Sequence, residues 1–165
     1  MFNVKKLAFG AAMLAASAVC FAAPKVEIVT SEGNIVVNLN EKAAPTTVAN
    51  FVKYAKEGFY NGTIFHRVIN NFMIQGGGFD RNLHQKSTHA PIKLEDKNGL
   101  KNTVGTIAMA RTNNPDSATS QFFINLKDND FLNGTSTKDG YAVFGEVVTG
   151  MDVVRKIGRA PTGSK

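Results

Sequence analysis

The feature that most constrains the fold is a series of short, β-prone segments separated by glycine, asparagine and aspartate. The segments cover residues 64–69, 72–75, 106–110, 121–126 and 141–148. They are rich in branched and aromatic side chains, which favour strands, whereas the residues between them favour turns. Several short strands in series are typical of a barrel or a sandwich. The sequence therefore predicts a mainly β fold.

The rest of the chain predicts a hairpin and two helices. Polar and apolar residues alternate from Val26 to Leu39 around the turn signal Ser31-Glu32-Gly33-Asn34, which predicts a β-hairpin. Apolar residues recur at helical spacing from Pro45 to Glu57, and Gly58 is a natural C-cap for that helix. The segment Thr149-Gly150-Met151-Asp152 resembles a capping box, so a second, short helix is expected to follow it.

The N-terminal residues 1–22 have the layout of a secretory signal peptide. Two lysines precede an apolar run that ends at Phe21, and cleavage after Ala22 fits best. The mature domain then covers residues 23–165, is located in the periplasm and has no membrane attachment. A retained anchor is one alternative, although the run is shorter than the ~20 residues that a spanning helix needs. A lipoprotein modified at Cys20 is another, and the residues before it fit that pattern poorly.

The composition of the mature chain argues against several classes of function. Loss of the two signal lysines lowers the net charge from +6 to +4, because the signal contains no acid. Lysine and arginine are spread among acidic residues, so no nucleic-acid surface is expected. The single cysteine leaves with the signal, which excludes a disulfide and a thiol nucleophile. The remaining ~140 residues suffice for one domain with one core.

The densest chemical pattern lies between Phe65 and Phe79. Phe65-His66-Arg67-Val68-Ile69, the turn Asn70-Asn71 and Phe72-Met73-Ile74-Gln75 predict a hairpin. Because side chains alternate along a strand, the turn can bring Phe72 and Gln75 towards Arg67. An arginine among Phe and Met suits a site that holds an apolar ring and offers donors to a nearby peptide group. From the residues alone, an arginine on the surface of a strand is the plainer interpretation.

These segments resemble the signature of the cyclophilins, a family of peptidyl-prolyl cis-trans isomerases. Met109-Ala110-Arg111, Ser120-Gln121-Phe122-Phe123-Ile124 and Gly140-Tyr141-Ala142-Val143-Phe144-Gly145 resemble later motifs of that family in the same order. The resemblance runs from about Val26 to Ile157 and is closest to the bacterial periplasmic subgroup. It implies an isomerase of Xaa-Pro peptide bonds that assists the folding of exported proteins. It also implies a monomer without a cofactor or a metal, whose partners are flexible, proline-containing polypeptides.

The family resemblance implies a specific architecture and a specific site. The fold would be a closed, eight-stranded antiparallel barrel capped by two α-helices. The family's final strand follows the segment Ala160-Pro161, and this sequence stops at Lys165, so we expect about twenty residues and the closing strand to be missing. Arg67 matches the catalytic arginine. The substrate-binding positions are matched by Phe72, Met73, Gln75, Ala110, Arg111, Gln121, Phe123, Leu132 and Tyr141.

Two positions depart from the commonest pattern of the family. Phe131 stands where a tryptophan is usual, so we expect weak binding of cyclosporin. Tyr141 stands where a histidine usually lines the proline pocket, and a phenol can still cover that pocket. Neither change removes a group that the isomerisation needs.

Other functions fit the sequence less well. A hydrolase could use Ser117 or Ser120, but no Gly-x-Ser-x-Gly elbow surrounds either serine. A metal site could use the three histidines, His66, His84 and His89, but no carboxylate stands at ligand spacing. A non-catalytic binder could use the same groove to hold unfolded chains. The two Asn-Gly-Thr triplets at 61–63 and 133–135 match the glycosylation pattern, and they also predict tight turns.

Overall fold

The computed structural model describes residues 23–163, which form one antiparallel sheet and two α-helices. The predicted signal peptide, residues 1–22, lies outside the described residues. Within residues 23–163, no helix is long and apolar enough to cross a membrane.

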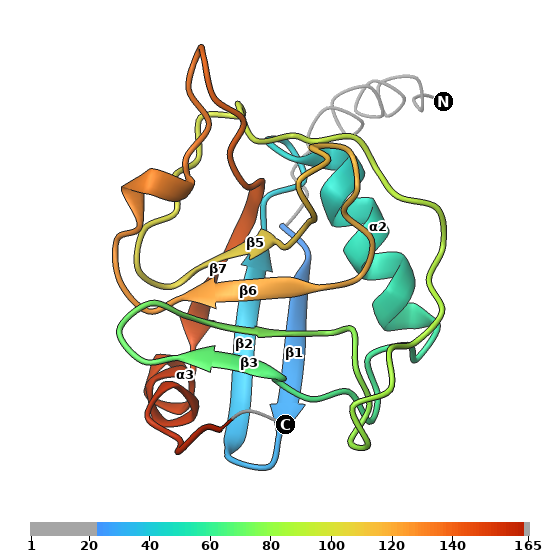
Figure 1. Ribbon diagram of the computed structural model, residues 1–165, viewed down its shortest axis with the longest axis vertical. Helices are drawn as coiled ribbons and strands as arrows, with labels where there is room; N and C mark the ends of the chain where they lie inside the picture. Colours follow the sequence, from blue (N-terminus) through green and yellow to red (C-terminus); the bar gives the residue numbers. More distant parts are fainter. Residues whose placement is uncertain (1–22, 164–165) are drawn as a thin grey trace, which may run out of the picture.

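The sheet has seven strands in the order β1-β2-β7-β5-β6-β4-β3, and every neighbouring pair is antiparallel. It curls strongly, so that β3 and β6 run across the direction of β1 and β2 (Figure 1). The strands are β1 (Lys25–Thr30), β2 (Gly33–Leu39), β3 (Arg67–Ile69), β4 (Met73–Gly76), β5 (Thr106–Met109), β6 (Phe122–Asn125) and β7 (Val143–Thr149).

A closed, eight-stranded barrel is not formed by the described residues. In the observed order, β1 and β3 lie at the two ends of the sheet and each pairs with one neighbour. A barrel would need these two ends to be joined through further strand pairing. The mainly β class, the antiparallel topology and the two helices are confirmed. The eight-stranded closure is not shown.

The predicted strands are confirmed in position, with different ends. The largest difference is at 64–69, where the strand covers Arg67–Ile69 alone. The partner strand stops being extended at Gly77, whose φ is +87°, so residues 64–66 have no regular ladder to join. Ile64 instead donates its backbone N–H to the carbonyl of Phe79 at 3.0 Å.

Helix α2 (Pro45–Lys56) ends as predicted and begins in a way that the sequence did not show. Gly58 has φ +73° and donates to the carbonyl of Ala55, while Phe59 donates to the carbonyl of Tyr54, which is the Schellman arrangement. At the other end, Ala44 offers no side-chain cap. The N-terminal N–H groups are instead bound by Glu95, which belongs to the long loop before β5.

Helix α3 (Met151–Gly158) is confirmed, but the predicted capping box is wrong. The N-cap is Gly150, with φ +94° and no side-chain hydrogen bond. A Cβ at this position would lie 2.3 Å from the carbonyl oxygen of Asn34 in β2. The close approach of two backbones therefore determines how this helix begins, and a side chain on Thr149 does not.

The two faces of the sheet carry two separate apolar clusters. The main core includes Ile74 and Phe122 of the sheet, Phe51 of α2 and Val154 of α3, so both helices close over the concave side. Because side chains alternate, the neighbouring residues of the same strands point to the other side. The cluster on that side is smaller and consists of Met73, Ala108, Phe123, Leu132 and Val143, with Phe72, Leu100, Ala110 and Tyr141 packed against it.

Candidate active site

A row of directly paired residues crosses four strands on the convex face. Arg67 of β3 lies opposite Gln75 of β4, Gln75 lies opposite Phe123 of β6, and Phe123 lies opposite Ala108 of β5. Residues that pair across antiparallel strands project on the same face. The fold therefore gathers an arginine, an amide and the smaller apolar cluster on one surface, although β5 and β6 follow β4 by many residues.

The hairpin between β3 and β4 brings the predicted residues together. Phe72 donates its backbone N–H to the carbonyl of Ile69 at 3.1 Å, which closes the turn over Asn70 and Asn71. Asn71 adopts φ +61°, a conformation that asparagine tolerates better than most residues. Phe72 is thereby placed beside the first residue of β4.

Two glutamine side chains link the arginine to the neighbouring strands. Arg67 donates from Nη1 to Oε1 of Gln75 at 3.3 Å, and Gln75 donates from Nε2 to Oε1 of Gln121 at 2.9 Å. Gly78 packs so closely on Gln121 that a Cβ there would lie 2.5 Å from its Cγ. Arg67 is exposed, so a ligand in solution can reach its guanidinium. The hydrogen bond to Gln75 orients that group.

The apolar part of the site is a cluster of largely buried side chains. Met73, Phe123 and Leu132 are 2%, 4% and 8% exposed. The ring of Tyr141 meets the ring of Phe123 edge to face, with 5.8 Å between centroids. These residues, with Phe72, are called the apolar pocket below. Its composition suits a small saturated ring, because it offers dispersion contacts without competing charges.

Phe131 extends the apolar surface outside the pocket. It follows Asp130 in the short 3₁₀ helix η1 (Asp130–Leu132) and is 61% exposed. Its ring stacks on that of Phe72 with 5.6 Å between centroids and 25° between planes. A smaller ring than tryptophan thus covers the edge of the pocket.

The side chain of Arg111 is turned towards the loop that carries Tyr141. Its Nε and Nη2 donate to the carbonyl of Gly140 at 3.0 and 2.9 Å, and its guanidinium lies 4.5 Å from the centroid of the Tyr141 ring. The N–H of Gly140 donates to the carboxylate of Asp96, which is 8% exposed, at 2.7 Å. Arg111 and Asp96 therefore hold Tyr141 in place through the backbone beside it.

His66 lies next to Arg67 in sequence and packs in a different environment. Its ring contacts Phe79, with 4.4 Å between centroids, and its Nδ1 is buried with no hydrogen-bond partner among the described residues. Burial, and secondarily the charge of Arg67, lower the pKa of this imidazole. The neutral ring adds no second positive charge beside the arginine.

The hydrolase and metal interpretations gain nothing from the geometry. The hydroxyl of Ser120 donates to the carbonyl of Gly77, and that of Ser117 donates to the carbonyl of Asn114, so neither serine is bonded to a base. His84 lies 3.8 Å from Asp80, whereas the ring of His89 contacts Glu57 at 2.7 Å. Within residues 23–163, no three His, Cys, Asp or Glu side chains are grouped for a metal ion.

Sequence reasoning missed the buried carboxylate of Asp96. It also missed three buried asparagines that lie beneath the apolar pocket, namely Asn102, Asn125 and Asn129. In a single sequence these residue types indicate turns and exposed loops. Their burial depends on which distant loops pack over them, so local pattern offers no signal for them.

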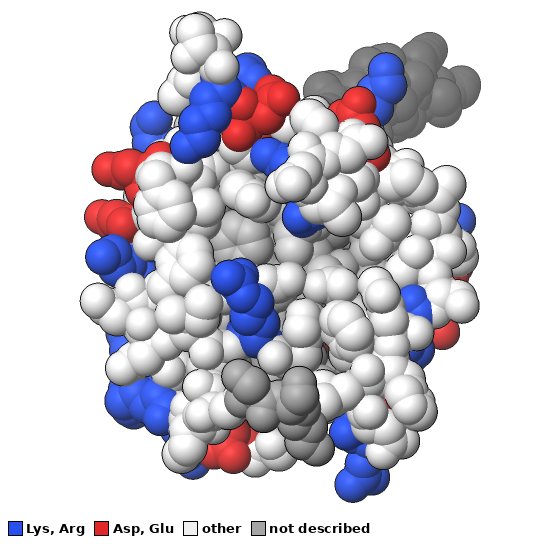
Figure 2. Space-filling model, viewed as in Figure 1, with Lys and Arg blue, Asp and Glu red and all other residues white. Residues whose placement is uncertain are grey.

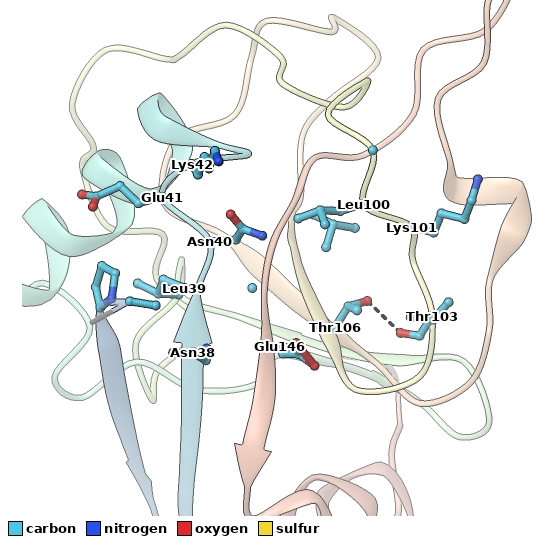
Figure 3. A pocket seen from close by; sticks show the side chains of 15 residues that line it. Asn38, Leu39, Asn40, Glu41, Lys42, Leu100, Lys101, Thr103, Thr106 and Glu146 are labelled. Carbon is cyan, nitrogen blue, oxygen red and sulfur yellow. Dashed lines mark hydrogen bonds between the residues drawn. The ribbon is translucent and has the colours of Figure 1, made fainter. Parts of the chain in front are cut away.

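A separate hollow of about 560 Å³ lies between the ends of β2 and β7 and the loop before β5 (Figure 3). It is lined by charges of both signs, including Glu41, Lys42, Lys101 and Glu146. None of the predicted site residues lines it. On the face shown in Figure 2, lysine and arginine are scattered among acids, and no broad basic patch stands out.

Comparison with known proteins decides the family. The model of the family described as cyclophilin type peptidyl-prolyl cis-trans isomerase/CLD matches residues 25–165. The chain belongs to this family. A peptidyl-prolyl cis-trans isomerase of Acinetobacter baylyi is 58% identical over 161 residues, which is 98% of this chain and 86% of that relative. Peptidyl-prolyl cis-trans isomerase B of Escherichia coli is 62% identical over 137 residues, which is 81% of this chain and 84% of that relative.

A solved cyclophilin has the same fold. The crystal structure of a cyclophilin type peptidyl-prolyl cis-trans isomerase from Cryptosporidium parvum, determined in the presence of the dipeptide Ala-Pro, matches with a TM-score of 0.72. It is 27% identical and covers 85% of this chain and 88% of its own. Membership places this chain among the peptidyl-prolyl cis-trans isomerases, the enzyme class predicted from its motifs. The roles of the individual site residues stay predictions.

Proposed function

We propose that this cyclophilin catalyses rotation about Xaa-Pro bonds at the surface formed by Arg67, Gln75 and the apolar pocket. Resonance opposes that rotation with a barrier of ~18–20 kcal/mol, and the uncatalysed reaction takes roughly tens to hundreds of seconds. A catalyst must weaken the partial double bond while it holds one side of the substrate still.

Arg67 supplies the electrostatic part of this mechanism. As the bond twists, the prolyl nitrogen becomes pyramidal and its lone pair leaves conjugation. A guanidinium donor near that nitrogen stabilises the twisted state more than the planar one, and this difference lowers the barrier. Arg67 is permanently charged and is oriented by Gln75 at 3.3 Å. No covalent intermediate is needed.

The apolar pocket supplies the anchor. Met73 and Phe123, with Leu132, enclose the proline ring, and Gln75 with the backbone near Arg111 binds the carbonyl side. With the ring fixed, rotation is confined to the other side of the bond, and little of the barrier is spent on ordering the substrate. The cyclophilin of Cryptosporidium parvum was crystallised in the presence of Ala-Pro, which supports a proline-containing ligand for this chain as well.

One observation carries the proposal: an exposed arginine, linked by hydrogen bonds through Gln75 to Gln121, stands beside an apolar cluster on the convex face of the sheet. A solvated surface arginine does not need such supports.

The test is the variant Arg67→Ala in a protease-coupled assay on a prolyl peptide. We expect kcat/KM to fall by about 10²–10³-fold, the loss typical of one oriented donor in a transition state, while KM changes little. Arg81→Ala, which removes an exposed arginine in the loop after β4, is the matched control and keeps full activity. An unchanged kcat/KM in an Arg67→Ala protein with a native circular dichroism spectrum would contradict the assignment and favour a non-catalytic binder.

The cellular setting is part of the same proposal. The apolar N-terminal segment supports export through a cleaved signal peptide, location in the periplasm and a role in folding exported proteins as a monomer. Exposed Phe131 in place of tryptophan supports weak binding of cyclosporin. The family resemblance supports closure of the sheet between β1 and β3. Fractionation of expressing cells and sequencing of the mature N-terminus test the export proposal, since an intact Met1 in the cytoplasm would refute it.

A further inference from the structure

Three buried asparagines form a continuous chain of side-chain hydrogen bonds beneath the apolar pocket. Asn129 donates from Nδ2 to Oδ1 of Asn125 at 2.8 Å, and Asn125 donates from Nδ2 to Oδ1 of Asn102 at 3.0 Å. The three residues are 1%, 0% and 1% exposed. Each amide is oriented by the acceptors around it, so the chain has one direction. Asn102, Asn125 and Asn129 are called the amide relay below.

The two ends of the relay bind the backbone of the pocket. Asn129 donates to the carbonyl of Phe72 at 3.0 Å. Nδ2 of Asn102 donates to Oδ1 of Asn133 at 3.1 Å and lies 3.3 Å from the carbonyls of both Leu132 and Tyr141, so these three acceptors share its two hydrogens. A hydrogen bond between Tyr141 and Leu132, from N–H to carbonyl at 2.9 Å, joins these two walls to each other.

The residues that the relay binds are the pocket members outside the strands. Met73 and Phe123 belong to β4 and β6, and the ladder fixes them opposite Asn125 and Gln75. Phe72, Leu132 and Tyr141 come from a turn, a 3₁₀ helix and a loop, which the ladder does not hold. Asn125, the middle residue of the relay, belongs to β6, so the relay connects the sheet by hydrogen bonds to the three pocket residues that lie outside it.

One polar atom of the relay is left without a partner. Oδ1 of Asn129 is buried and has no hydrogen-bond partner among the described residues, and such a group costs free energy. An apolar side chain of the same size would remove this unpaired oxygen, but it would also take the donor from Oδ1 of Asn125 and from the carbonyl of Phe72. The unpaired oxygen is accounted for if both Nδ2 hydrogens are required, one for the relay and one for Phe72.

We infer that the amide relay sets the distance between the walls of the apolar pocket, and that Asn102, Asn125 and Asn129 are positioning residues for the proline ring. This inference rests on the proposed function of the pocket. The ring is held alike in the planar and twisted states, so loosening the walls weakens both states equally. Such a loss raises KM and leaves kcat nearly unchanged.

KM separates positioning from a purely structural role. A variant that is merely less stable contains fewer folded molecules, which lowers the apparent kcat and leaves KM as it was. Loss of Arg67 has the opposite signature to loss of the relay, because it lowers kcat. The proposed function and the relay can therefore fail separately: Arg67→Ala tests the first, and the asparagine variants test the second.

The variants are Asn102→Ala and Asn129→Ala, with kcat and KM measured on a prolyl peptide. We expect KM to rise about tenfold in each, as for the loss of one buried hydrogen bond. In the double variant the effects combine to less than their product, because both break one chain. An unchanged KM in folded single variants overturns the inference.

Thr106→Val is the matched control. The Thr106 hydroxyl accepts the second Nδ2 hydrogen of Asn125 at 3.0 Å and donates to the carbonyl of Thr103 at the wall of the separate hollow (Figure 3). This branch leads away from the pocket. The control loses comparable hydrogen bonds, and we expect its KM to stay within about twofold of the parent value. A tenfold rise in the KM of Thr106→Val would contradict the inference, because it would show that loss of any buried hydrogen bond in this region weakens substrate binding.

A measurement on the unmodified protein covers the case in which a variant does not fold. The side-chain amide NMR signals of the relay are followed while a prolyl peptide is added. We expect the signals of all three relay residues to shift with one saturation curve. The amide of Asn34, which donates to Glu27 at 2.9 Å in the first hairpin, is expected to stay constant. Constant relay signals at saturating peptide overturn the inference.

Discussion

Glu95 caps the N-terminus of helix α2 from 48 positions away in the sequence. Its Oε1 accepts the N–H of Thr47 at 2.7 Å and the hydroxyl of Thr47 at 2.6 Å, and its Oε2 accepts the N–H of Thr46 at 3.3 Å. The helix has no side-chain cap of its own and no acid in its first turn. Glu95 thus supplies both the capping acceptor and the negative charge that this end favours.

The free-energy cost of losing Glu95 can be built up from these contacts. Loss of a capping side chain costs about 1 kcal/mol, and loss of a negative charge at a helix N-terminus costs about 0.3–1 kcal/mol. The hydroxyl of Thr47, a fully buried residue, also loses its acceptor, which costs about 1 kcal/mol. The 3.3 Å contact is long and adds little. We expect Glu95→Ala to lower the free energy of unfolding by about 2–3 kcal/mol, and Glu95→Gln by about 0.5–1 kcal/mol because it keeps the acceptor.

The assay is urea unfolding followed by circular dichroism, with the free energy taken from midpoints at a common slope. Glu41→Ala is the control, because Glu41 is an exposed acid in the turn before the same helix, and we expect a change below about 0.5 kcal/mol. The reasoning is refuted if Glu95→Ala lies within that range of the parent, or if the glutamine variant is as damaging as the alanine variant.

Two further changes probe the site and its pH dependence. Gly78→Ala places a methyl group against Gln121 and displaces the amide that supports the site, so we expect kcat/KM to fall about tenfold. The control is Gly163→Ala, which has open space around it and is expected to leave activity unchanged. A fall of equal size in both variants would contradict this. The pKa of His66 is lowered in the folded state, so as pH falls the unfolded chain binds a proton at this residue before the folded protein does. The contribution of His66 to stability is therefore complete above its ordinary pKa of 6.5 and is lost as pH falls through the lowered value. Urea unfolding of His66→Gln between pH 7 and pH 5 should therefore show a smaller loss of stability than the parent, and an equal loss would rule out this cause.

The hairpin from Phe65 to Gln75 shows how far local rules reach. Alternation along a strand and a turn at Asn70-Asn71 are sufficient to bring Gln75 close to Arg67. In the observed register three residues separate Ile69 from Met73, and this loop length places Gln75 directly opposite Arg67. The end of α2 at Gly58 is a second success of this kind, because a glycine with positive φ acts on the turn that precedes it. In both cases the interacting residues are within one turn or one strand of each other.

The predictions that failed or stay open depended on contacts between distant segments. The capping box at Thr149 was locally reasonable, but Gly150 is required by the backbone of β2. The closed barrel was inferred from family resemblance, and the described residues leave β1 and β3 at the ends of the sheet. Arg111 was assigned to the groove by family resemblance, and this assignment stays a prediction; its side chain is bound to Gly140 and stacked on Tyr141.

By itself, the sequence determined the strand and helix segments, the approach of Gln75 to Arg67 and, through the order of its motifs, the family. Tertiary structure alone decided that Gln75 and Phe123 would share a surface, that Glu95 would cap α2 and that three asparagines would support the apolar pocket. The physical reason is the range of the forces. Backbone geometry imposes periods of two and 3.6 residues on the chain locally, whereas burial and hydrogen bonding between loops depend on which segments meet when the sheet curls and its core forms.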